Sequence, residues 1–211
     1  MRARSLGAVV HTTRNLTAAD RARVKGIPVT RASRVVVDLL GRVPEPILFA
    51  LADDVLWRLR DAAEIRRTWQ RAAGGRNRGR LEQVLLPWTP GPKPGSPKEM
   101  SLARVLLLHG LPRPVRQHLL LIPGQKHPRY LDLAYPDVRV AMEYDGRRDH
   151  GPRQWAADAA REDELDQIGW VRLPAGRRDL VEPHATAYCD VVRSACQRDG
   201  IGTTVRVAAA R

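Results

Sequence analysis

The 211-residue sequence has few of the features that define secreted, membrane-spanning or disulfide-bonded proteins. Its two cysteines, Cys189 and Cys196, lie seven positions apart and cannot form a disulfide framework. Apolar blocks such as 105–108 and 119–122 are four residues long and none exceeds six, whereas a membrane-spanning helix needs about 20. The basic start has too short an apolar stretch for a secretory signal. We therefore expect a soluble, cytoplasmic protein with no membrane partner.

Several catalytic and cofactor-binding motifs are also absent from the sequence. It contains no Walker phosphate loop, no dinucleotide-binding glycine fingerprint and no nucleophile elbow. The histidines are scattered and lack the spacing of zinc ligands. These absences direct attention to the acidic side chains.

The net charge is +13, because 36 Lys and Arg outnumber 23 Asp and Glu. Such an excess suits a polyanionic partner, most often nucleic acid. However, 32 of the 36 basic residues are arginine and alanine is abundant, a bias that GC-rich coding produces without any binding role. The excess is larger in residues 1–90, with 17 basic and 8 acidic side chains, than in residues 91–211, with 19 and 15. The composition leaves both explanations open.

Prolines divide the chain into two parts. The stretch 87–97, PWTPGPKPGSP, has five prolines and two glycines, which indicates an extended linker. We predict a mainly helical region with short strands over 1–88, a Pro-rich linker over 89–97, an α/β domain over 98–200 and a tail over 201–211. Apolar spacing in the first region predicts helices over 31–40, 47–59, 62–70 and 80–86, with short strands near residues 8–12, 24 and 29. Trp57 and Trp69 are expected to pack in its core.

The second part has the alternating pattern of an α/β domain. A helix is expected from Ser96 or Pro97 to His109, where Gly110 ends it. The remaining pattern predicts strands over 115–122, 130–135 and 138–145, a helix over 153–168, a strand over 170–173 and a helix over 183–197. The order is α-β-β-β-α-β-α.

Three carboxylates interrupt strands that are otherwise apolar: Asp132, Glu143 and Asp145. A carboxylate buried without a partner is costly, so these groups should be exposed, paired or metal-bound. If Pro136 and Asp137 form a two-residue turn, Asp132 faces Ala141 and Glu143 is its diagonal neighbour, about 7–8 Å away on the same face. A three-residue turn would instead put the two acids on opposite faces.

Two acids on one face could hold a single divalent cation, and oxygen ligands favour Mg²⁺ or Mn²⁺. Such a cation beside a basic surface suits phosphodiester hydrolysis. Alternatively, Asp132 and Glu143 form ion pairs with Arg129, Arg139 or Arg147. His150 follows the last of these strands and could act as general acid or base, or be an ordinary loop residue.

The segments VAMEYDGRRDH and WAADAAREDELDQIGWVRL make the sequence similar to a known family. They resemble the very-short-patch-repair-endonuclease-like (Vsr-like) domain of the PD-(D/E)XK nuclease superfamily, over about residues 96–175. The matching positions are Ser96, Pro97, Glu99, Asp132, Glu143, Asp145, Gly146, His150, Asp158, Arg161, Asp163, Gly169 and Trp170.

This resemblance implies a restriction-endonuclease-like α/β core with a Mg²⁺ or Mn²⁺ site. Asp132 and Glu143 would be the metal ligands, and Glu99 would steady the metal-bound water. The lysine usual in the superfamily two positions after the Glu is Asp145 here, so Asp145 becomes a further candidate ligand and His150 the candidate for proton transfer. The expected phosphate contacts are made by Arg129, Arg147 and Arg148.

The upstream segments VHTTRNL and GIPVTRASRVVVDL resemble the middle region of actinobacterial proteins similar to AbiEi-type antitoxins of type IV toxin–antitoxin systems. Those proteins usually begin with a winged helix-turn-helix, which this sequence lacks. Two functions are therefore expected. The first is a metal-dependent DNA endonuclease, possessing the set Asp132, Glu143 and His150. The second is a non-catalytic DNA-binding regulator or antitoxin with the same fold and a cognate toxin as its partner.

Overall fold

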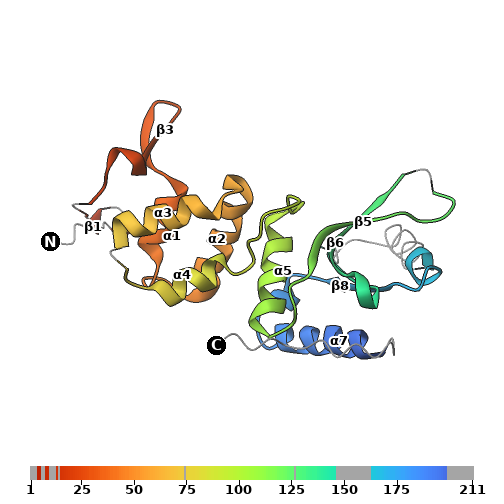
Figure 1. Cartoon of the computed structure of the whole chain (residues 1–211). Coiled ribbons are helices and arrows are strands. Elements are labelled where there is room, and N and C mark those ends of the chain that lie inside the picture. The colour runs from red at the N-terminus through yellow and green to blue at the C-terminus, as the bar shows by residue number, and fades with distance from the viewer. Residues whose placement is uncertain are drawn as a thin grey trace.

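The fold is taken from a computed structural model of the chain, in which residues 4–5, 8–9, 13, 15–73, 75–125, 127–145 and 163–198 are described. It is a mixed α/β structure (Figure 1). The first part contains the paired strands β1 (Arg4–Ser5) and β2 (Ala8–Val9), the hairpin β3 (Arg21–Val24) and β4 (Ile27–Thr30), and the helices α1 (Ala32–Leu39), α2 (Glu45–Leu59), α3 (Ala62–Ala73) and α4 (Arg78–Leu85).

The second part is built on one four-stranded sheet. Helix α5 (Pro97–Leu108) leads into β5 (Val115–Leu120), β6 (Arg129–Tyr135) and β7 (Val140–Tyr144), and β8 (Val171–Ala175) and α7 (His184–Arg198) complete it. The strand order is β5-β6-β7-β8, with the last pair parallel and the others antiparallel. The predicted order of helices and strands is confirmed wherever it falls on described residues; most of the helix expected over 153–168 lies outside them.

Separate hydrophobic clusters hold the parts together. One lies among α1 to α4 and includes Met100 of α5. A second packs α5 and α7 against one face of the sheet, through residues such as Leu106, Met142 and Val192. A third, with Leu165 and Trp170, lies against Ala134 and Ala141 of β6 and β7. Since α5 contributes to the first two clusters, it joins the helical part to the sheet (Figure 1).

The hairpin of β3 and β4 is tied to the helices by a buried ion pair. Arg34 of α1, only 2% exposed, donates from Nη1 to Asp20 Oδ2 at 3.0 Å. The backbone carbonyl of Asp20 accepts a hydrogen bond from the Arg31 N–H at 2.8 Å. This anchor fixes the base of the hairpin, while its tip stands away from the helices (Figure 1).

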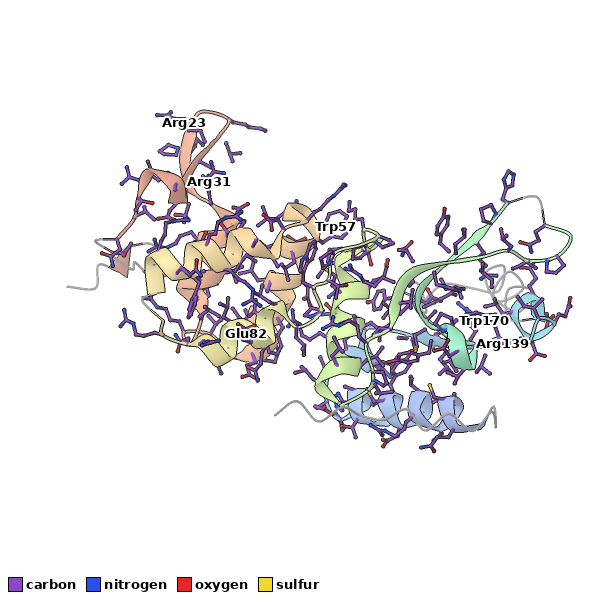
Figure 2. The ribbon with its side chains drawn as sticks, viewed as in Figure 1. Arg23, Arg31, Trp57, Glu82, Arg139 and Trp170 are labelled. Atoms are coloured by element: carbon purple, nitrogen blue, oxygen red, sulfur yellow. The ribbon has the colours of Figure 1, made fainter. Side chains whose placement is uncertain are left out.

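The proline-rich segment has no helix or strand of its own, yet it is packed in place. The Trp57 indole N–H donates to the Pro94 carbonyl at 3.0 Å, and the Arg116 guanidinium donates to the Thr89 carbonyl. Figure 2 shows Trp57 at the end of α2, on the side of the molecule where this segment passes toward α5. The segment therefore contacts both the helical part and the sheet.

The turn between β6 and β7 differs from the two-residue turn that we expected. Tyr135 pairs with Val140, so four residues make the connection. Pro136–Val138 form a 3₁₀ turn, and Arg139 takes a left-handed conformation with φ of 48°. The strand pairing is thereby shifted by two residues, which places Asp132 opposite Glu143 instead of Ala141. Because side chains alternate with a period of two, both acids stay on one face.

Helices α2, α4 and α5 meet around a buried ion pair. Arg104 of α5 is 3% exposed and donates to the carboxylate of Asp53, which is 1% exposed. Its guanidinium also donates to the Gln83 carbonyl and, at 2.8 Å, to the Val84 carbonyl. Ser101 donates to Asp53 Oδ2 at 2.9 Å. All the charge of this arginine is thus compensated inside the protein.

We predict that Asp53→Ala lowers the free energy of unfolding by about 3–5 kcal/mol, because it leaves Arg104 buried without its counter-ion. The neighbouring Asp54→Ala is the matched control, since its ion pair with Arg58 is exposed and should contribute little to stability. Urea denaturation measures both values. Equal destabilisation of the two variants would contradict the assigned role of Asp53.

Candidate functional site

Glu99 is fixed at the start of α5 by the local sequence. Ser96 is the N-cap, and its hydroxyl accepts a hydrogen bond from the Glu99 N–H at 3.3 Å. The Glu99 carboxylate is 5% exposed and turns back to accept from the Gly95 N–H at 2.8 Å. A Cβ at position 95 would come within 2.7 Å of Glu99 Oε1, so a larger residue there would displace the carboxylate. The result is a buried carboxylate held at a defined position.

Gln117 of β5 connects this carboxylate to Asp132 of β6. Its Nε2 donates to Glu99 Oε2 at 2.7 Å, and its side chain also hydrogen-bonds Asp132. The β5–β6 register on either side of Gln117 places it opposite Asp132. Gln117 has φ of 47°, in the left-handed region that non-glycine residues rarely adopt. Such strained backbone is concentrated at functional sites in proteins.

Asp132 is the acid of this cluster whose pKa is strongly shifted. Burial raises the pKa of its carboxyl to about 7, and repulsion from Glu99 and, to a smaller extent, Glu143 adds to the increase. The Tyr144 N–H opposes the shift by donating to Asp132 Oδ2 at 3.0 Å. Carboxylates from α5 and β7 are therefore close enough to Asp132 of β6 to raise its pKa.

Glu143 is directed toward arginines. Its Oε2 accepts from Arg172 Nε of β8 at 2.6 Å, and its Oε1 lies 3.8 Å from Arg129 Nη2. Arg129 also pairs with Glu164 at 3.3 Å. The ion pair with Arg129 is one of the alternatives that the sequence left open, and it occupies an arginine that we expected to contact phosphate.

The remaining expected site residues lie at or beyond the end of β7. The backbone N–H of Asp145 donates to the Ala175 carbonyl at 2.8 Å, which places Asp145 next to the end of β8. Arg147, Arg148 and His150 lie outside the described residues, so their predicted roles stay predictions. The same holds for Gly146, Asp158 and Arg161.

Two residues of the site, Gln117 and Arg172, are not predicted from the sequence. Both are polar side chains within strands of largely apolar pattern, which is the same signal that draws attention to the three acids. The local pattern places each of them in a strand but gives no partner for its side chain. Their partners come from other strands, so neither contact follows from local sequence.

The donors present fit a hard divalent cation. The carboxylates of Glu99 and Asp132 and the amide oxygen of Gln117 are all oxygen ligands, and Mg²⁺ is commonly held by one or two carboxylates with water or phosphate at its other positions. Within the described part of the chain, however, no group of three or more His, Cys, Asp or Glu side chains is arranged to hold a metal. Glu143 would have to leave Arg172 to become a third carboxylate ligand.

Comparison with known proteins gives relatives without an assigned function. The chain is 30% identical over 175 residues to uncharacterized proteins MT2308 and Rv2248 of two Mycobacterium tuberculosis strains, CDC 1551 / Oshkosh and ATCC 25618 / H37Rv. The match covers 81% of this chain but 61% of each relative, so the chain spans about three fifths of their length. No protein-family model matches the chain, and no solved structure matches it significantly. Among the helices that the structure describes, none is long and apolar enough to cross a bilayer.

We predict that Asp132 makes the protein less stable as the pH rises, provided EDTA keeps it metal-free. A pKa of about 7 in the folded state, against an ordinary 3.8, means that the folded protein holds a proton that the unfolded chain releases. Stability therefore decreases between about pH 4 and pH 7 and stays low above that range.

The measurement is the melting temperature of Asp132→Asn and wild type at pH 5 and pH 8. The variant should gain most over wild type at pH 8, because it carries no charge to bury. Asp137→Asn, an exposed position in the turn after β6, is the control and should follow wild type. Parallel curves for wild type and Asp132→Asn would contradict the assignment.

Proposed function

We propose that this protein is a Mg²⁺- or Mn²⁺-dependent, Vsr-like endonuclease of the PD-(D/E)XK type that hydrolyses phosphodiester bonds in DNA. The observation that carries the proposal is the proximity of Glu99 of α5 and Glu143 of β7 to the partly buried Asp132 of β6, whose pKa both carboxylates raise. Burial is the larger cause of the raised pKa of Asp132, and repulsion from the two other carboxylates adds to it; a divalent cation would favour the charged form of all three acids. The sheet order and the preceding helix support the same core.

Each acid has a distinct role in this proposal. Asp132 and Glu143 would hold the cation, and Glu99 would orient the attacking water. Gln117 keeps Glu99 and Asp132 in position through its hydrogen bonds. Bound there, a divalent cation would supply Lewis acidity toward the scissile phosphate and lower the pKa of a water molecule. In the absence of the cation, Arg172 compensates the charge of Glu143.

The proton acceptor would come from the segment after β7. Asp145 occupies the position of the superfamily lysine, and a carboxylate cannot neutralise charge as that lysine would. We assign proton transfer to His150, and contacts with the scissile phosphate to Arg147 and Arg148, as expectations from the resemblance. Arg129 would take part in phosphate binding only after releasing Glu143 or Glu164.

The DNA would also contact the hairpin of β3 and β4. Residues 21–31 contain Arg21, Arg23, Lys25 and Arg31 and no acidic side chain. The tip of this hairpin stands away from the helices, and Arg23 and Arg31 lie along it (Figure 2). A projecting basic hairpin of this kind suits the phosphate backbone of nucleic acid.

We predict that cleavage of supercoiled or mismatched DNA requires Mg²⁺ and stops in EDTA. Asp132→Asn and Glu143→Gln should each reduce the cleavage rate by about 10–100-fold or more, because each removes a cation ligand. Glu164→Gln is the matched control, since it also removes a partner of Arg129 but lies outside the acid cluster. DNA that is shifted in a gel but never cut, with Glu143→Gln behaving as wild type, would show that the nuclease proposal is wrong.

We predict that the double variant Arg23→Gln/Lys25→Gln binds DNA more weakly and with less salt dependence. Removing one phosphate-binding cation should lower the slope of log K against log salt by about 1, so the double variant should lower it by about 2. Fluorescence anisotropy over a salt series measures this slope. Arg58→Gln is the control, because Arg58 is an exposed cation already paired with Asp54. An unchanged slope in the double variant would exclude the hairpin from the interface.

A second candidate function is a non-catalytic DNA-binding regulator of the antitoxin type, with a cognate toxin as its partner. The contact between Glu143 and Arg172 favours it, because a positive side chain already fills the need for a cation beside Glu143. Asp145 in place of the superfamily lysine points the same way. This candidate predicts that DNA binding survives in EDTA and in Glu143→Gln without any cleavage, whereas the nuclease proposal requires cleavage that stops in EDTA and slows by at least about tenfold in Glu143→Gln.

A further inference from the structure

A pocket lies where the proline-rich segment passes between α2 and β5. It has a volume of about 490 Å³. Its wall is formed by Trp57 near the end of α2, by Arg60 and Asp61 just after that helix, by residues 88 and 90–94, and by Arg116 of β5. Volumes of about 300–1,000 Å³ are typical of small-molecule sites. Neither Glu99, Asp132 nor Glu143 lines the pocket, so the proposed catalytic site leaves it without a role.

The wall of the pocket combines cations with aromatic rings. Arg60, Lys93 and Arg116 contribute three positive charges, against the single carboxylate of Asp61, which is paired with Arg67 at 3.0 Å. The Lys93 ammonium lies 4.1 Å from the centre of the Trp57 ring, and the Arg116 guanidinium lies 5.8 Å from that of Trp88. Both indoles are half-buried. The pocket therefore carries a net positive charge and contains aromatic ring surfaces.

Arg116 is a buried cation whose charge is not fully compensated. It is 7% exposed, and one nitrogen donates to the Thr89 carbonyl. Its Nη1 has no hydrogen-bond partner within the described part of the chain. Burial, followed by repulsion from Arg113, lowers the pKa of Arg116; the Glu99 carboxylate opposes this from a distance without forming an ion pair. Arg104 shows the contrast, because its counter-ion is in direct contact.

An uncompensated buried cation is costly, and proteins keep few of them without a ligand or partner. An anion in the pocket would supply the missing acceptor and counter-charge. A guanidinium and an ammonium together are the groups that bind phosphate best, and the indole rings add surface on which a planar ring can stack. A bare phosphate ion would fill only a small part of the volume.

We propose that this pocket binds a nucleotide, with the phosphate on Arg116 and Lys93 and the base against Trp57 or Trp88. The nucleotide is either free or the 5′-phosphorylated end of a single strand, since both present the same chemistry. Base stacking on indole is tolerant of base identity, so little preference among bases is expected. Binding requires neither a metal nor the acid cluster.

The test is isothermal titration of the full chain with AMP, adenosine and inorganic phosphate, with EDTA present throughout. AMP should bind and adenosine should bind at least about tenfold more weakly, because it lacks the group that Arg116 and Lys93 contact. Affinity for AMP should fall as salt is raised. A 5′-phosphorylated oligonucleotide compared with its unphosphorylated form distinguishes a strand end from a free nucleotide.

Variants separate the pocket from the rest of the protein. Lys93→Gln alters an exposed side chain and should weaken AMP binding several-fold, and Arg116→Lys should weaken it by about tenfold because one ammonium replaces a forked donor. Arg178→Gln, which removes an exposed cation outside both the pocket and the hairpin, should bind as wild type. Asp132→Asn should also bind as wild type, which makes this result independent of the nuclease proposal.

The inference is overturned by any of three results. The first is that wild type does not bind AMP at millimolar concentration. The second is that adenosine or inorganic phosphate binds as tightly as AMP. The third is that Lys93→Gln and Arg116→Lys bind AMP with the affinity of wild type. Thermal melting tests whether Arg116→Lys is folded. If that variant is unfolded, the binding of AMP to Lys93→Gln decides the outcome.

Discussion

The buried ion pair between Arg104 and Asp53 is the contact on which the arrangement of the two parts depends. Arg104 belongs to α5, Asp53 to α2, and the carbonyls that Arg104 also contacts lie in α4. Charges buried this deeply tolerate little displacement, because separation leaves each of them without water or partner. The pair therefore sets the position of α5 relative to the helical part, and α5 in turn carries Glu99 to the sheet. A site that looks confined to the second part is positioned by the first.

The buried charged groups of this protein differ in whether an opposite charge lies in contact with them. Arg104 and Arg34 are buried with carboxylates in contact, and Glu143 is paired with Arg172. Asp132 instead lies among other acids, and Arg116 among other cations. Within the described part of the chain, neither of these last two groups has an opposite charge in direct contact. Perturbed groups of this kind mark functional sites more often than fully paired ones do.

Much of the fold could be predicted from the sequence, because helix spacing and strand alternation are local signals. The helices α1 to α5 and the order of helices and strands along the chain follow from them. The shared face of Asp132 and Glu143 does not, because it depends on the length of the turn between β6 and β7. The pairing register could not be predicted, because it depends on Arg139 adopting a left-handed conformation that nothing at that position demands. The contacts of Gln117 and Arg172 are unpredictable for a related reason: they join residues from different strands. The proline content of residues 87–96 agrees with their lack of helix and strand, but it gives no sign that they line a pocket.

The turn between β6 and β7 has a consequence for how this chain can vary among relatives. Four residues occupy it, two more than the shortest hairpin connection. Insertions or deletions of two residues there preserve which side chains share a face, whereas a change of one residue moves every later side chain of β7 to the other face. Such a change would disrupt the hydrophobic packing of Met142 and the placement of Glu143 together. Length variation at this turn is therefore constrained to even steps, independently of which residues fill it.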